Sequence, residues 1–219
     1  MILYIDTAFN KTRVAVKKDS KIYSSEINQN TDISKNLIND TKKILKESNS
    51  KKKDIKLIGY NKGPGNFTSL RISLAYIKAL SYYLGIPVIE LNSFQILGAS
   101  YFNSNYVLPF TIAIDARMSE IYWSEYENYN DLFLKKNNFN LTIDKVLVKK
   151  YENKKNKDKI IIYNESSILR NLDKYIEKID IDLEKIFTVI EKKLNDTKCE
   201  AIDTKLLYIR NNVAKKKNE

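Results

Sequence analysis

The side chains that could carry chemistry are few in this chain of 219 residues, and one common type is missing. The sequence contains no histidine and a single cysteine, Cys199. Because imidazole is the usual general base near neutral pH and the commonest metal ligand, serine or cysteine triads and histidine-based metal sites are excluded. Any catalysis would rest on Asp, Glu, Lys or Tyr. Cys199 has no second thiol to pair with and is expected to be packed or inert.

A glycine-rich loop could hold an anion through its backbone. Three of the five glycines, Gly59, Gly63 and Gly65, fall close together in the sequence. The loop Gly63-Pro64-Gly65 precedes a helical pattern, and the N–H groups at a helix start favour negative charge. The loop matches neither the dinucleotide-binding G-x-G-x-x-G pattern nor a P-loop, so the anion signal is weak.

The net charge of +11 is a weaker sign of nucleic-acid binding than it first suggests. Most of the 38 basic residues are Lys, and Asn, Ile and Tyr are also abundant, which is typical of a coding bias and favours a solvated surface. The Lys-rich stretches Lys149–Lys159 and Lys215–Lys217 leave RNA binding as an alternative. Arg is rare, and because Lys cannot reproduce its planar fork, each Arg is a candidate for a specific geometric role. The arginines are Arg13, Arg71, Arg117, Arg170 and Arg210.

The apolar runs of the sequence bear on the cellular compartment of the protein. They are far shorter than the roughly 20 residues that a membrane span needs. Met1 runs directly into an apolar strand that meets Asp6, with no basic region followed by a long apolar one. This start has no pattern of a signal peptide, so we expect a cytoplasmic protein with no membrane contact.

The first half of the chain reads as strands followed by helices. Short β-rich runs at Leu3–Asp6, Arg13–Lys17 and Lys21–Ser25 indicate a meander. Apolar residues then recur at helical spacing from Thr31 to Lys46. A uniformly apolar strand at Ile55–Tyr60 leads through the glycine loop to a helix from about Thr68 to Leu84, with Thr68 as its expected N-cap.

The helix at 68–84 carries two apolar stripes where a helix of a small domain normally has one. Phe67, Leu70, Leu74 and Ile77 form one stripe, and Ile72, Ala75, Ala79 and Tyr83 form the other. The second stripe either lies in the protein's own core or forms a partner surface, and the residues alone leave both explanations open. Since small residues permit close helix approach, Ala75 and Ala79 favour the second stripe as the outward one.

The second half repeats the order of strands and helices, which predicts a duplicated α/β architecture. Strands are expected at Val107–Ile114 and Ile121–Tyr126, with Asp115-Ala116-Arg117 as the turn between them. We place a first lobe at residues 1–102, a second lobe at 103–204 and a tail at 205–219. Leu206 and Leu207 indicate that the tail packs back on the first lobe.

Four segments resemble the TsaB (YeaZ) family of bacterial proteins. The run from Lys62 to Ala75 is similar to the family signature G-P-G-S-F-T-G-L-R-I-G-x-A. Ile2–Thr7 resembles the opening I-L-A-I-D-T, Ile114–Trp123 resembles I-D-A-R-M-G-E-V-Y-W, and Leu207–Lys216 resembles the terminal Y-L-R-x-x-V-A-x-K-K. The matches occur in the family's order and reach both ends of the chain.

The resemblance implies a fold and a role. The fold is the two-lobed α/β fold of actin and sugar kinases (ASKHA), with duplicated mixed-sheet lobes and flanking helices. The role lies in making threonylcarbamoyladenosine in ANN-reading tRNAs. In that family TsaB is a non-catalytic partner of TsaD, which transfers the threonylcarbamoyl group. TsaE is an ATPase that joins the complex, TsaC makes the threonylcarbamoyl-adenylate, and TsaB alone forms homodimers. The tRNA is reached indirectly, and no cofactor or metal is implied for this chain.

The resemblance also assigns residues. The first-lobe helices are the family's usual partner surface, so the expected partner-binding residues are Ile33, Leu37, Thr68, Arg71, Ile72, Ala75, Ala79 and Tyr83. Motif residues with structural roles are expected at Asp6, Gly63, Pro64, Gly65, Phe67, Asp115, Arg117, Tyr208 and Arg210.

Several of these residues have competing roles. For Asp6, capping a turn is favoured over holding a metal-bridged phosphate. For Asp115 and Arg117, an internal ion pair or a backbone contact is favoured over a ligand. Arg71 needs either an internal carboxylate or an interface, and the tail residues Tyr208 and Arg210 are interpreted as packing residues before interface anchors.

The sequence departs from the family pattern at several positions. Ser69 and Ser73 replace glycines, and no glycine occurs around Tyr163, where the family often has Gly-Asp-Gly. The loss of small residues there puts a nucleotide site in doubt. The alternatives to a scaffold are a sugar-kinase-like ATPase, a glycoprotease or a direct tRNA-binding module, and the absence of His and the scarcity of Gly count against both enzymes.

Overall fold

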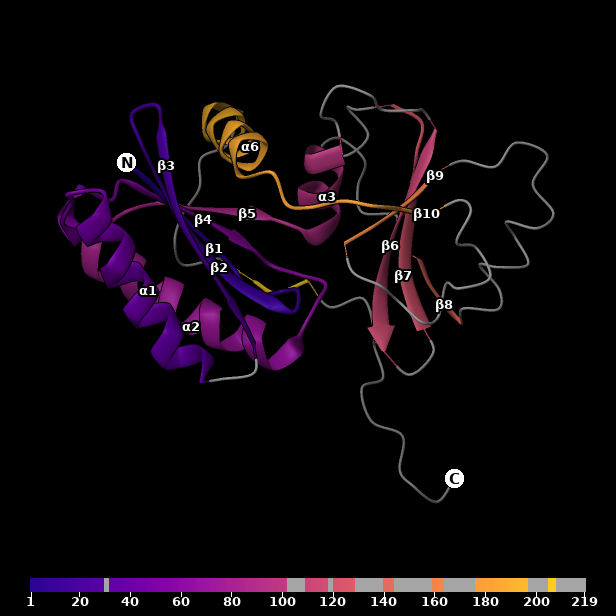
Figure 1. Ribbon diagram of the computed structural model, residues 1–219, viewed down its shortest axis with the longest axis horizontal. Helices are drawn as coiled ribbons and strands as arrows, with labels where there is room; N and C mark the ends of the chain where they lie inside the picture. The colour runs from indigo at the N-terminus through magenta and orange to yellow at the C-terminus, as the bar shows by residue number, and fades with distance from the viewer. Residues whose placement is uncertain are drawn as a thin grey trace, which may run out of the picture.

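The structure is a computed structural model that describes residues 1–29, 32–101, 109–117, 120–128, 140–143, 159–163, 176–196 and 205–207. Within these ranges the chain forms two five-stranded mixed sheets, one in each half of the sequence. Figure 1 shows the two sheets side by side, with a helix, α3 (Ser93–Tyr101), between them. None of the helices in the described ranges is long and apolar enough to cross a membrane.

The first sheet is built around its first strand. It has the order β3-β2-β1-β4-β5, with β1 antiparallel to β2 and parallel to β4. The expected meander is confirmed, and the third strand runs further than its β-rich part suggested because it pairs along the whole of β2. The bounds are β1 (Ile2–Asp6), β2 (Lys11–Lys18), β3 (Lys21–Asn28), β4 (Leu57–Asn61) and β5 (Val88–Leu91), with a short 3-10 helix η1 (Lys52–Asp54) before β4.

Two helices cover one face of the first sheet. They are α1 (Ile33–Glu47) and α2 (Phe67–Leu84), which lie next to each other beneath the sheet in Figure 1. Their inward residues share one apolar core with Leu3, Ile5, Val14 and Val16 of the sheet. This face of the sheet is thus closed by helices of the same lobe.

Both helices start at residues whose side chains cap the free N–H groups. Asp32 Oδ1 accepts from the N–H groups of Ser34 at 3.0 Å and Lys35 at 3.1 Å. The N-cap of α2 is Asn66, not Thr68 as the sequence suggested. Asn66 has extended backbone angles and its Oδ1 accepts from Ser69 N at 3.3 Å, which places Thr68 inside the first turn.

The second sheet has the order β10-β9-β6-β7-β8. Its first strand extends through Arg117, so the expected turn at Asp115-Ala116-Arg117 is wrong. Asp115 pairs with Ile121 and Arg117 with Glu120, with an irregular register between them, because this strand continues to pair with its neighbour up to the end. The bounds are β6 (Phe110–Arg117), β7 (Glu120–Tyr126), β8 (Asn140–Ile143), β9 (Lys159–Ile162) and β10 (Ile176–Lys178).

Helix α6 (Leu183–Asp196) crosses back to the first sheet, although its position in sequence lies in the range expected for the second lobe. It covers the sheet face opposite α1 and α2 (Figure 1). The Phe187 ring meets the Tyr4 ring edge-on at a centroid distance of 6.3 Å, and Lys17 Nζ lies 2.6 Å from Glu191 Oε1. The core on this side includes Phe110, Ile112 and Ile161 of the second sheet, so the two sheets share it.

Gly59 in β4 lets α6 approach the sheet, because a Cβ there would overlap the Ile190 side chain at Cδ1. We expect Gly59→Ala to lower the free energy of unfolding by about 1–3 kcal/mol through overpacking. Ile190→Val removes Cδ1, so the double variant should be more stable than the sum of the two single effects. Urea denaturation of the four proteins measures this coupling. Strictly additive effects would contradict the contact between α6 and β4.

Candidate functional site

The Asp6 carboxylate lies at the end of β1, and for this residue turn capping was expected in preference to binding of a metal-bridged phosphate. It is fully buried, and both of its oxygens accept hydrogen bonds. Oδ1 accepts from Ala8 N at 2.9 Å and Asn61 Nδ2 at 3.1 Å, and Oδ2 accepts from the Tyr4 hydroxyl at 3.1 Å. Burial raises the pKa of Asp6, and these donors and the nearby charge of Arg13 oppose that shift.

The loop Gly63-Pro64-Gly65 is held by bonds within the chain. Gly63 N donates to Asn61 Oδ1 at 2.9 Å, and Ser93 N donates to the Gly63 carbonyl at 2.9 Å. Pro64 is buried, and a Cβ at Gly65 would overlap the Ala8 carbonyl. Asn66 N donates to the same carbonyl at 2.7 Å. The N–H groups of Gly63 and Asn66 therefore already have acceptors within the protein.

Arg13 joins the two lobes beside Asp6. Its side chain is buried, and it donates from Nε to Glu26 and from Nη2 to the Tyr163 hydroxyl. The guanidinium carbon lies 4.8 Å from the centroid of the Tyr163 ring, and Phe9 packs against the same ring at 4.9 Å. Tyr163 follows β9 of the second sheet, so its ring brings the second sheet into contact with Arg13 of the first.

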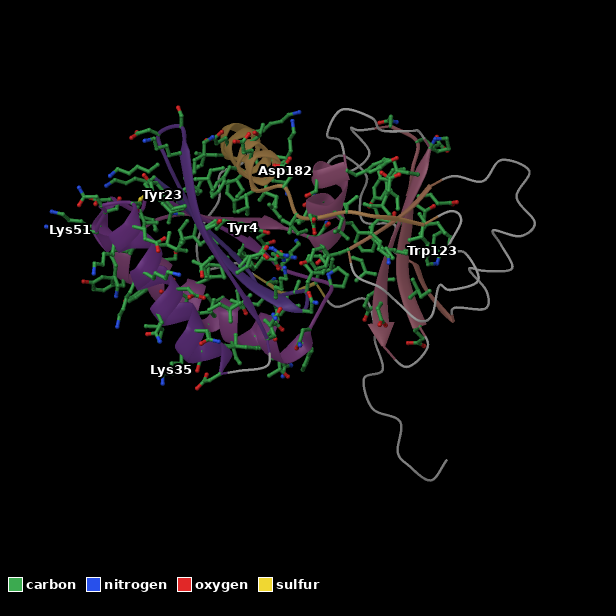
Figure 2. All side chains as sticks on the ribbon, viewed as in Figure 1. Tyr4, Tyr23, Lys35, Lys51, Trp123 and Asp182 are labelled. Atoms are coloured by element: carbon green, nitrogen blue, oxygen red, sulfur yellow. The ribbon has the colours of Figure 1, made fainter. Side chains whose placement is uncertain are left out.

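Both oxygens of the Asp6 carboxylate thus have donors from the chain itself. Among the residues that the structure describes, no three Asp, Glu or Cys side chains come together as ligands for a metal ion. Figure 2 shows Tyr4, whose hydroxyl bonds Asp6, in the interior of the first lobe. The geometry fits a structural carboxylate better than a catalytic one.

The two serines that replace family glycines are also bonded inside the lobe. Ser73 Oγ accepts from Thr7 Oγ1 at 2.8 Å, and Ser69 Oγ donates to Gln29 Oε1 at 2.9 Å. Gln29 Nε2 in turn donates to the Thr7 carbonyl at 2.9 Å. The serines therefore link α2 to the end of β1 by hydrogen bonds.

A second candidate site is the solvent side of α1 and α2, which we call the outer helical face. It consists of the exposed residues of the two helices: Ser34, Lys35, Ile38, Asn39, Lys42, Lys43, Lys46 and Glu47 of α1, and Phe67, Thr68, Arg71, Ala75, Lys78, Ala79, Tyr82 and Tyr83 of α2. Figure 2 shows Lys35 on the side of α1 that points away from the sheet.

The burial of α2 resolves which of its stripes faces outward. Leu70 and Ile77 of the first stripe are buried, whereas Ala75 and Ala79 of the second are exposed, so the expected orientation is confirmed. Tyr82 and Tyr83 are 88% and 77% exposed, which leaves two large rings in solvent at the end of the helix. Ala75, Ala79 and Tyr83 of the second stripe are therefore exposed, whereas Ile72 of the same stripe packs against the core.

Three of the expected partner-binding residues point inward to different extents. Leu37 is completely buried in the core under α1, so it cannot contact a partner in this fold. Its place in the apolar stripe of an amphipathic helix explains the burial. Ile33 and Ile72 are half-buried and pack against the same core. Thr68, Arg71, Ala75, Ala79 and Tyr83 are exposed.

The remaining motif residues fall at scattered places. Arg71 is exposed and its guanidinium carbon lies 3.8 Å from the centroid of the Phe67 ring, a cation–π contact within the first turns of α2. Asp115 is exposed on β6, and only the backbone of Arg117 is described. Tyr208 and Arg210 lie outside the described residues, as do most of the Lys149–Lys159 stretch and all of Lys215–Lys217.

Glu90 anchors the described part of the tail to the first lobe. Its Oε1 accepts from the N–H of Lys205 at 2.9 Å and from the Tyr60 hydroxyl at 2.8 Å, and its Oε2 pairs with Lys62 Nζ at 2.9 Å. Leu207 N donates to the Lys62 carbonyl at 2.9 Å.

Sequence reasoning missed three residues of these sites: Glu90, Ile38 and Tyr82. A lone acid in a short strand carries no sequence signal that would mark it as a site residue. Ile38 and Tyr82 did carry such a signal, because they fall outside the apolar stripes that were expected to be buried.

Glu90 gives the tail a pH dependence whose sign follows from its partners. Burial opposes ionisation, but the bonds from Lys62, Lys205 and Tyr60 outweigh it and hold the pKa of Glu90 below its ordinary value of 4.5. The anchor is therefore complete above that value and is lost as the pH falls through the lowered pKa.

We expect Glu90→Gln to reproduce this loss at neutral pH. The amides of Lys205 and Leu207 should exchange with deuterium about 5- to 30-fold faster, as loss of about 1–2 kcal/mol of anchoring implies. Hydrogen exchange corrected for intrinsic rates measures it, with Glu47→Gln on the exposed side of α1 as the control. Unchanged protection in Glu90→Gln would show that the carboxylate does not anchor the tail.

Comparison with known proteins places these features in a family. The family model described as TsaD, tRNA N6-adenosine threonylcarbamoyltransferase, matches residues 28–168, which is more than half of the chain. The tRNA threonylcarbamoyladenosine biosynthesis protein TsaB of Buchnera aphidicola from Schizaphis graminum is 32% identical over 60% of this chain and 63% of its own length. The TsaB proteins of Buchnera from Acyrthosiphon pisum and of Escherichia coli are 28% and 29% identical over 71% and 58% of this chain. The alignments cover 71% and 54% of those two relatives.

Solved structures show the fold. YeaZ from Pseudomonas aeruginosa superposes with a TM-score of 0.72 at 17% identity, covering 95% of this chain and 99% of its own. A second structure, described as an uncharacterized protein with similarity to peptidase YEAZ from Pseudomonas aeruginosa, superposes at 0.76 with 18% identity and the same coverage. The two mixed sheets with their helices form the two-lobed ASKHA-like α/β fold. The chain therefore belongs to the family that the TsaD model describes, and within it to the TsaB (YeaZ) proteins.

Proposed function

We propose that this chain is a non-catalytic subunit that binds a TsaD-like threonylcarbamoyltransferase and is required with it for threonylcarbamoyladenosine in ANN-reading tRNAs. The proposal includes a TsaE-like ATPase that joins through the complex, contact with tRNA only through the complex, and a cytoplasmic location. It needs no cofactor or metal held by this chain.

The outer helical face is the observation that carries the proposal. Ala75 and Ala79 leave a shallow, apolar strip on α2 between Phe67 at one end and the Tyr82–Tyr83 pair at the other. Exposed Tyr rings beside small residues are typical of protein interfaces, in which aromatic anchors enter pockets of the partner. Ile38 of α1, 43% exposed, adds an apolar side chain to the same face. The same face would serve pairing with a second copy of the chain.

The closed cluster at Asp6 supports a non-catalytic role. A sugar-kinase-like ATPase needs a carboxylate that is free to reach metal and phosphate, but both oxygens of Asp6 accept bonds from the protein. The Tyr163 ring, packed against Phe9 and Arg13, occupies space that a nucleotide would need near this carboxylate. A glycoprotease of the metal-dependent kind lacks its usual ligands in a chain without histidine.

The first test is a charge placed on α2. Ala79→Glu should weaken binding to the organism's own TsaD-like protein by about 2–4 kcal/mol, since it introduces an unpaired charge that binding must desolvate. The fold should be unaffected, because Ala79 is exposed. Isothermal titration calorimetry measures the affinity and circular dichroism the fold.

Two matched variants complete this test. Thr188→Glu adds the same charge on the exposed side of α6 and should leave the affinity unchanged. Ile77→Glu buries the charge in the α2 core and should unfold the first lobe. Ile77 is the better fold control than Leu74, which is only half-buried. Equal binding by Ala79→Glu and Thr188→Glu would exclude this strip as the docking site.

The second test concerns activity. The isolated protein should hydrolyse ATP no faster than buffer and should not cleave peptides, because the Asp6 cluster is occupied and histidine is absent. In a reconstituted system, Asp6→Asn, which keeps the size of the side chain, should retain threonylcarbamoyladenosine formation if the protein still folds. Turnover by the pure chain that disappears in Asp6→Asn would establish it as an enzyme instead.

A further inference from the structure

One end of the first lobe gathers exposed lysines from three segments. Lys21 is the first residue of β3, Lys51, Lys52 and Lys53 lie in and beside η1, and Lys56 directly precedes β4. All five side chains are exposed, and together they form what we call the basic end. Figure 2 shows Lys51 at this end of the first lobe, away from the second sheet.

Hydrogen bonds hold these three segments together. Lys18, the last residue of β2, donates from Nζ to the carbonyl of Ser48 at 3.0 Å and to that of Asn49 at 3.2 Å, which ties the turn after β2 to the end of α1. Lys56 N donates to the Met1 carbonyl at 3.0 Å, which fixes the start of β4 beside the start of β1. The lysines therefore belong to one surface.

The positive charge of the basic end is little offset by nearby carboxylates. In residues 18–21 and 49–56 the acids are Asp19, which is exposed, and Asp54, whose Oδ2 accepts from Lys51 N at 2.7 Å. None of the five lysines pairs with a carboxylate of the described residues, whereas Lys17 and Lys62 each pair with a Glu, at 2.6 and 2.9 Å. Helix α6, which covers the same sheet, has as many acidic as basic residues.

We propose that the basic end binds the phosphate backbone of RNA, and that this chain thereby adds contacts to the tRNA held by the complex. The identity of the RNA as tRNA rests on the proposed function. A Lys ammonium binds phosphate as a point charge, so the contact is independent of base sequence. Five lysines release few counterions, so they add to the tRNA binding of the complex and do not replace it.

The side chains at this end favour RNA over a protein as the partner. The large apolar side chains that the described part of the chain exposes are Ile38, Phe67, Tyr82, Tyr83 and Leu194, and all of them lie outside residues 18–21 and 49–56. The basic end thus lacks the apolar centre that a protein interface normally has. Its exposed polar neighbours include a hydroxyl and an amide, groups that also bond phosphate oxygens.

The basic end lies next to the outer helical face without sharing its centre. Helix α1 ends at Glu47, four residues before Lys51, whereas Ala75 and Ala79 lie further back along α2. A partner on the outer helical face would therefore have RNA bound at the basic end as its neighbour. Both surfaces could be occupied in one complex.

The test is the salt dependence of tRNA binding by the complex with a TsaD-like protein. Lys52→Gln with Lys53→Gln should weaken binding about 3- to 10-fold at about 50 mM NaCl and should make the slope of log K against log salt shallower by about 1–2. Fluorescence anisotropy of labelled tRNA measures both quantities. Lys52→Arg with Lys53→Arg keeps the charges and should bind as the original chain does.

The matched control removes the same charge from another surface of the lobe. Lys185→Gln with Lys192→Gln on α6 should change neither the affinity for tRNA nor the salt slope. Titration calorimetry should give the same affinity for the TsaD-like protein in all of these variants. Equal losses of tRNA binding in the α6 pair and in the Lys52 and Lys53 pair would show that only net charge matters, and would overturn the inference.

Further outcomes separate this inference from the proposed function. If no complex forms, the proposed function fails, and the same variants of the isolated chain still test the basic end at about 20 mM salt, where screening is weak. If the complex binds tRNA and Lys52→Gln with Lys53→Gln changes nothing, the function stands and the inference fails. Binding to vesicles of phosphatidylserine and phosphatidylcholine that needs Lys52 and Lys53, with tRNA binding unchanged, would make this end a membrane surface and would also overturn the inference.

Discussion

The structure depends on a central sheet that has to be covered on both of its faces. Leu3 and Ile5 of β1 enter the core under α1 and α2, whereas Tyr4 enters the opposite core under α6. One face is closed by helices that follow nearby in sequence, and the other by a helix from the far end of the described chain and by the second sheet. α1 and α2 each use one side to cover this sheet, and the residues on their other sides are exposed to solvent.

The same requirement explains the buried polar cluster. Asp6 lies where β1 ends between the two cores, and a carboxylate buried there needs donors from several elements. Tyr4, Ala8 and Asn61 supply them, and Arg13 brings a positive charge and a link to Tyr163. The bonds of Arg13 to Glu26 of β3 and to Tyr163, which follows β9, connect the two lobes beside this carboxylate.

The sequence predicted those features that depend on local periodicity. The meander, α1 and the double stripe of α2 all follow from spacing along one element. The outward position of Ala79 was expected for another reason, because small residues permit close helix approach. It did not predict features that depend on contacts between distant segments. Asn66 caps α2 because the loop before it is fixed by Ala8, and Glu90 holds Lys205 across a long stretch of sequence.

Side-chain footprinting measures directly whether the outer helical face is a docking surface. Hydroxyl radicals should oxidise Tyr82 and Tyr83 readily in the free chain, since both rings are mostly exposed. With a saturating amount of the TsaD-like protein, their oxidation should fall several-fold, while that of Leu194 on α6, 43% exposed, should not change. Protection of Leu194 with Tyr82 and Tyr83 still oxidised at the free rate would contradict the account.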